Sequence, residues 1–131
     1  MSTTIRQALK QGIDNHKAGK LKEAEDIYRA ILKDQPMQPH ANFNLGLILI
    51  SKNQKETAIR LFKNAIDANP KVEQFWVSYI DTLFKNNQLE EAQYFVEKAI
   101  GNGFDEKRMK AIISDSSSAN KGKLPPSEKV Q

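Results

Sequence analysis

The chain has 131 residues, with 20 basic and 16 acidic side chains and a formal net charge of +4. This length suffices for one domain with a modest core, and the lack of cysteine excludes disulfides, thiolate metal sites and cysteine nucleophiles. Charges of both signs are interspersed without a run of five or six like charges, which indicates solvated helix faces and no basic stripe for nucleic acid.

The first pair of helices is predicted over about residues 5–38. Its first helix starts near Thr4, and its apolar residues follow helical spacing: Ile5, Ala8, Leu9, Gly12 and Ile13. Gly12 lowers helix propensity, so we expect the second helix to cross closely there. Gly19 suits a left-handed turn, and the second helix ends at Gln35-Pro36 because the residue before a proline disfavours helical geometry.

The second pair is predicted over about residues 39–72. Pro39 is placed well in the first turn of a helix, where its missing N–H has no cost. The helix that follows, to about Lys52, is apolar nearly all round, which predicts burial on several sides. The next helix runs from about Lys55 to Ala68 and stops at Asn69-Pro70.

The third pair is predicted over about residues 73–104, with the chain's single tryptophan, Trp76, in its first helix and a turn at Asn86-Asn87. A seventh helix over about residues 105–114 begins at Asp105 as its cap and covers the end of the third pair. Residues 115–131 are rich in Ser, Lys, Gly, Pro and Glu, so we expect a disordered tail or linker there.

Similar residues recur 34 positions apart along these pairs. The recurring sets are Ala24, Ala58 and Ala92; Tyr28, Phe62 and Val96; and Ile31, Ala65 and Ala99. Gly12 and Gly46 occupy one further register, where Ile80 departs from the small-residue rule. A fixed period of this length is typical of a solenoid of helix–turn–helix units.

These registers resemble the tetratricopeptide repeat (TPR) family, whose pattern is W-x₂-L-G-x₂-Y followed by Ala, Phe, Ala and Pro. The matching residues are Leu45, Gly46, Ala58, Phe62, Ala65 and Pro70 in the second unit, and Trp76, Ala92 and Ala99 in the third. The resemblance covers roughly residues 5–104. It implies an all-α fold, a right-handed α-solenoid of three TPR helix-turn-helix units plus a C-terminal capping helix, within a TPR domain over residues 1–114.

Motifs that carry chemistry are missing from the sequence. It has no P-loop, no G-x-G-x-x-G and no H-E-x-x-H. His16 and His40 lie in different units without a companion ligand, and the acidic residues Glu23, Glu25 and Asp26 lie where they complement a helix dipole. We therefore expect no enzyme activity, no catalytic residue, no cofactor and no metal site.

The resemblance implies a concave groove lined by the first helix of each unit. Its expected lining residues are Arg6, Leu9, Lys10, Ile13 and Lys17; His40, Phe43, Asn44, Leu47 and Ser51; and Gln74, Val77, Ser78, Asp81 and Lys85. An apolar floor with polar edges suits a partner's peptide or amphipathic helix. An alternative is that the short array uses these positions as part of its hydrophobic core. For Leu9 and Ile13 the core and groove interpretations have equal weight.

Within the family, chaperone-binding members grip a C-terminal carboxylate with Lys, Asn and Arg side chains. The corresponding residues here are Leu9, Ile13, Asn44, Gln74 and Ser78, and only Asn44 agrees. A carboxylate needs several cationic donors, so the sequence argues against that ligand.

The function expected from the sequence is a protein–protein interaction scaffold. One alternative, from similarity to N-terminal TPR modules of larger bacterial proteins, is a non-catalytic substrate-recruiting module of a transferase. Another is a self-assembly module that forms homo-oligomers. No apolar run marks a signal peptide at residues 1–10 or a membrane span, so we expect a cytoplasmic protein without a membrane or nucleic-acid partner.

Overall fold

The computed structural model describes residues 3–114, and the expected tail at 115–131 lies outside them. The described part folds into helices without a strand. The helices are α1 (Thr3–Lys17), α2 (Leu21–Asp34), α3 (Pro39–Ser51), α4 (Lys55–Ala68), α5 (Glu73–Lys85), α6 (Leu89–Gly101) and α7 (Glu106–Ser114). Helix α1 begins one residue before the expected Thr4, which therefore lies inside the first turn.

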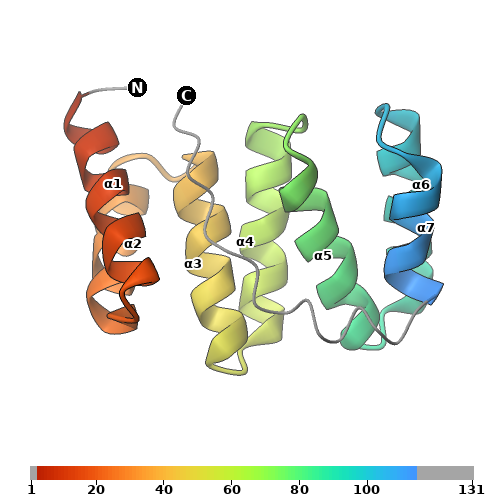
Figure 1. Ribbon diagram of the computed structural model, residues 1–131, viewed down its shortest axis with the longest axis horizontal. Helices are drawn as coiled ribbons and strands as arrows, with labels where there is room; N and C mark the ends of the chain where they lie inside the picture. The colour runs from red at the N-terminus through yellow and green to blue at the C-terminus, as the bar shows by residue number, and fades with distance from the viewer. Residues whose placement is uncertain (1–2, 115–131) are drawn as a thin grey trace.

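Figure 1 shows the helix pairs following one another in chain order, from the red and orange α1 and α2 at one end to the blue α6 and α7 at the other. Helices α1 and α2, α3 and α4, and α5 and α6 form the three pairs, and α7 packs against both α5 and α6. This arrangement confirms the predicted all-α solenoid of three helical units with a C-terminal capping helix.

The turn inside each pair repeats with the same geometry. Gly19, Asn53 and Asn87 take left-handed backbone conformations, with φ of 80°, 63° and 62°. The next residue's N–H then donates back to the helix: Lys20 to Asn15, Gln54 to Leu49 and Gln88 to Leu83, each at 2.9 Å. Gly and Asn are the residues that tolerate this conformation, so the repeated turn depends on these positions.

The two helices of each pair cross at a point where one side must be small. A Cβ added at Gly12 would lie 2.6 Å from the Tyr28 ring, and one added at Gly46 would lie 2.4 Å from the Phe62 ring. This is the close crossing that Gly12 predicts. In the third unit the same registers hold Ile80 and Val96, both buried, so the space is filled from the first helix instead of the second.

Side chains on α3 and α5 also hydrogen-bond to the loops that precede these helices. Asn42 Nδ2 donates to the Pro36 carbonyl at 3.0 Å, and Trp76 Nε1 donates to the Pro70 carbonyl at 2.8 Å. Pro36 and Pro70 follow the C-caps of α2 and α4, so two unlike residues in one register make the same contact. Within residues 3–114 no helix combines the length and apolar character that crossing a membrane requires.

Helix α7 closes the apolar end of the third unit. Asp105 Oδ2 accepts a hydrogen bond from the Arg108 N–H at 2.9 Å, as a helix cap does. Met109 and Ile112 are buried, and the Phe104 ring lies 6.0 Å from the Trp76 ring. Helix α7 thus extends the hydrophobic core beyond α5 and α6.

Candidate functional site

The residues expected to line a groove lie on α1, α3 and α5, and the structure separates them by burial. The exposed ones are Arg6, Lys10, Lys17 and Ser51, and the half-buried ones are Leu47, Gln74, Val77, Asp81 and Lys85. We call these exposed and half-buried residues the A-helix face. The remaining residues are buried: Leu9, Ile13, His40, Phe43, Asn44 and Ser78.

The buried aromatic members hold the second and third units together. The Phe43 ring lies 5.4 Å from the Phe62 ring of α4 and 4.8 Å from the Phe75 ring of α5. The His40 ring meets Phe75 edge-on at 5.7 Å, and burial lowers the pKa of His40. Phe43 has no exposed area, so Leu47 and Val77 are the apolar residues of the expected lining that are not buried.

Asn44 belongs to a buried polar chain that links the first two units. It hydrogen-bonds the Tyr28 hydroxyl, which also lies 3.3 Å from His16 Nδ1. Burial raises the pKa of Tyr28 well above its ordinary value, and the hydrogen bond with Asn44 opposes that rise. The one residue that matched the carboxylate-binding pattern therefore has a partner inside the protein.

Helix α5 presents three polar groups in succession. Lys85 Nζ lies 2.9 Å from Asp81 Oδ2, and both side chains are largely covered, with 28% and 15% exposed. Ser78 Oγ and Asp81 Oδ1 are buried and have no hydrogen-bond partner in the part of the chain that the structure describes. Buried polar atoms normally find a partner, so this pair stands apart.

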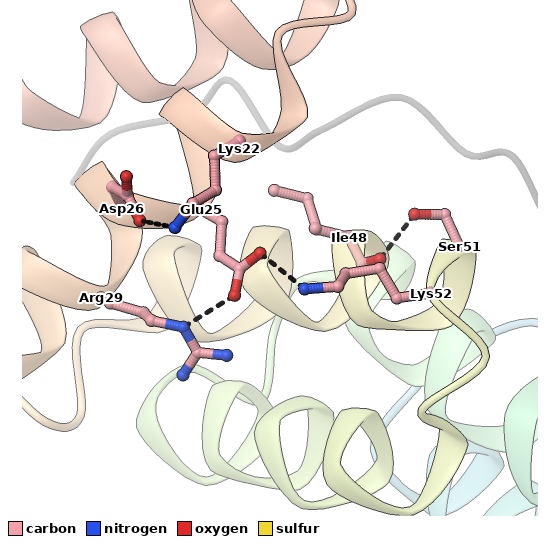
Figure 2. A network of polar contacts seen from close by, with 7 residues as sticks. All are labelled: Lys22, Glu25, Asp26, Arg29, Ile48, Ser51 and Lys52. Carbon is pink, nitrogen blue, oxygen red and sulfur yellow. Dashed lines mark hydrogen bonds and ion pairs between the residues drawn. The ribbon is translucent and has the colours of Figure 1, made fainter.

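Sequence reasoning missed an ion-pair network between the first and second units. Figure 2 shows the Glu25 carboxylate of α2 between Arg29 and Lys52, with Arg29 Nε at 2.9 Å and Lys52 Nζ at 3.1 Å. Burial alone would raise the pKa of Glu25, but the hydrogen bonds and charges of Arg29 and Lys52 outweigh it and lower the pKa. No local pattern could have indicated Lys52, which lies 27 residues further along the chain.

Two further features of residues 3–114 give less support for a binding site. A polar depression near the turn tips is lined by Asn53, Gln54, Lys55, Glu56, Thr57 and Asn86, without an apolar anchor. No group of three or more His, Cys, Asp or Glu side chains in these residues is placed to hold a metal ion.

Comparisons with known proteins agree with the fold. Two family models described as tetratricopeptide repeat match residues 9–59 and 49–115. The crystal structure of the Sgt2 TPR domain from Aspergillus fumigatus is similar, with a TM-score of 0.71 and 22% sequence identity. That match covers 99% of this chain and 90% of the other. A search of curated proteins finds no match.

Proposed function

Because the chain belongs to the tetratricopeptide repeat family, we propose that it is a scaffold that holds a segment of a partner protein on its A-helix face. Repeats of this family generally bind protein partners. The observation that carries the proposal is the pair Leu47 and Val77, which are aliphatic and half-buried on α3 and α5.

The composition of this face suits a peptide or an amphipathic helix. Leu47 and Val77 leave apolar area in contact with water, and covering it with a partner's side chain is favourable. The A-helix face also carries the Lys85–Asp81 ion pair on α5 and the exposed Arg6 on α1, which supply charge and hydrogen-bonding groups. An apolar centre with a polar rim is the usual anatomy of a protein interface.

The finer features of the function belong to the same proposal. The module binds without catalysing a reaction, and recruitment of a substrate protein to a larger bacterial transferase would use the same face. A cytoplasmic location would suit either role. These features rest on the family resemblance.

The test uses peptides selected on the chain from a random display library. The double variant Leu47→Ala/Val77→Ala removes apolar area on α3 and α5, and its matched control Ile59→Ala/Ile100→Ala truncates half-buried aliphatic residues on α4 and α6. We expect the first variant to lower peptide affinity about twentyfold and the control less than about twofold. Equal affinities for both variants, measured by calorimetry on folded protein, would contradict the proposal.

Self-association is a second candidate, favoured by exposed apolar residues on α6. Leu89 is 50% exposed and Tyr94 is 60% exposed. The Tyr94 ring lies against Phe95 at 5.0 Å, with Lys98 Nζ 5.9 Å from its centroid. Sedimentation that reports a monomer at all concentrations would exclude this candidate.

A further inference from the structure

Helices α6 and α7 form the end of the array opposite α1 (Figure 1). They pack against each other, so their solvent-facing sides adjoin. The exposed side of α6 includes Tyr94, a large aromatic residue that is 60% exposed. The charged residues on the same two helices indicate which surface would cover this ring.

The exposed residues of α6 and α7 carry opposite net charge. Helix α6 has three glutamates and one lysine: Glu90, Glu91, Glu97 and Lys98. Helix α7 has the reverse balance, one glutamate and three basic residues: Glu106, Lys107, Arg108 and Lys110. Arg108 is paired with Glu73 of α5 at 3.2 Å, which leaves the two lysines as the basic groups of α7 beside α6. An acidic helix therefore lies next to a basic helix on one surface.

The charged sides of the two helices lie close enough to act on each other. The pKa of Lys110 is raised, mainly by its hydrogen bond with Glu106 and to a smaller extent by the charge of Glu97 on α6. Glu90 and Lys107 form no ion pair within residues 3–114, and both are exposed. Each helix thus has a charge that a second chain can neutralise.

We infer that the α6–α7 surface is a self-complementary contact through which two copies of the chain pair. A two-fold contact uses the same surface on both copies. When the two-fold axis runs between α6 and α7 and along them, α6 of each copy faces α7 of the other. Acidic residues then face basic residues twice. When the axis runs across the helices, each helix faces its own copy and like charges meet, which is unfavourable.

The inference rests on self-association, the second candidate function, to which it adds a surface and a symmetry. No residue of the A-helix face lies on α6 or α7, so this pairing leaves that face open. A dimer presents two A-helix faces, and a partner with two binding segments would bind it with increased avidity.

The experiment measures dimerisation of the full chain by sedimentation at low salt, with two charge-reversal variants. Glu90→Lys/Glu97→Lys leaves both helices basic, and Lys107→Glu/Lys110→Glu leaves both acidic. Each variant alone should dimerise about tenfold more weakly than wild type, because like charges then face each other. An equal mixture of the two should dimerise within about threefold of wild type, because each helix of one variant faces a helix of opposite charge on the other.

The control Glu23→Lys/Glu56→Lys reverses exposed first-turn glutamates on α2 and α4, with the same change in net charge as Glu90→Lys/Glu97→Lys, and should dimerise like wild type. A melting temperature close to that of wild type shows that each variant is folded. A mixture that stays monomeric would overturn the pairing of α6 with α7.

Other outcomes separate this surface from self-association as such. If only the α6 variant weakens association, α6 binds a different basic surface such as α1 of the next copy, and the symmetric pairing is wrong. Dimerisation that is insensitive to every reversal would overturn the α6–α7 surface and leave self-association standing. A monomer at all concentrations would overturn both and leave the scaffold proposal untouched.

Discussion

The boundary between units 1 and 2 differs from the boundary between units 2 and 3. At the first, Glu25 of α2 pairs with Lys52 after α3, and the Tyr28 hydroxyl links His16 with Asn44. At the second, the rings of His40 and Phe43 pack on Phe75 of α5. Polar pairs thus contribute at one boundary and aromatic contacts at the other. The two boundaries should respond differently to truncation, pH and salt.

Truncation at the aromatic boundary should have the largest effect. Phe75→Ala removes a fully buried ring that contacts His40 and Phe43, and we expect a loss of about 3–5 kcal/mol in the free energy of unfolding. Urea denaturation measures it. The control Tyr94→Ala removes a ring that is 60% exposed and should cost less than about 1 kcal/mol. Similar losses in the two variants would contradict an aromatic boundary.

Removing the charge at the polar boundary should cost less. Glu25→Gln weakens the contacts to Arg29 and Lys52, whose side chains are half exposed, so we expect a loss of about 1 kcal/mol. The exposed Glu23→Gln on the same helix is the matched control. Urea denaturation at low and high salt should show that added salt narrows the difference between wild type and Glu25→Gln. A difference independent of salt would argue against a charge-based contact.

The pH dependence of the free energy of unfolding should also differ between the two boundaries, by smaller amounts. Burial lowers the pKa of His40. Its contribution to the free energy of unfolding is therefore complete above the ordinary pKa of 6.5 and falls as the pH drops below that value. The pKa of Glu25 is lowered by Arg29 and Lys52 against the effect of burial. The contribution of Glu25 to the free energy of unfolding is therefore complete above pH 4.5, the ordinary pKa of a glutamate, and is lost as the pH falls through the folded-state pKa.

Unfolding measured between pH 7 and pH 3 should show both changes. Glu25→Gln should remove the loss of stability that wild type shows below about pH 4.5. His40→Phe should reduce the loss of stability that begins near pH 6.5. An unaltered acid limb in Glu25→Gln would mean that the network does not stabilise the fold through its charge.

The fold was predictable because the features that determine it are local and repeated. Gly19, Pro36 and Pro70 set turns and helix ends, and the 34-residue period pairs the helices. Contacts between units were not predictable in the same way. The period places Phe43 on the first helix of its unit, but it does not show that the Phe43 ring packs on Phe75 of the next unit.

The candidate site was predictable in part for the same reason. Leu47, Val77 and Asp81 were identified from their positions in the unit, and the structure places them at the surface or partly covered on α3 and α5. Which hydroxyl or carboxylate oxygen is left without a partner depends on side-chain geometry that one sequence does not reveal. Ser78 Oγ is such an atom.

The most direct test of the central claim is to map a bound peptide onto the chain by amide chemical shifts. A display-selected peptide is titrated into ¹⁵N-labelled protein, and perturbations are compared between the first helices α1, α3 and α5 and the second helices α2, α4 and α6. We expect the largest shifts around Leu47, Val77 and Ser78. Shifts confined to the second helices, or to the α6 surface around Tyr94, would contradict binding on the A-helix face.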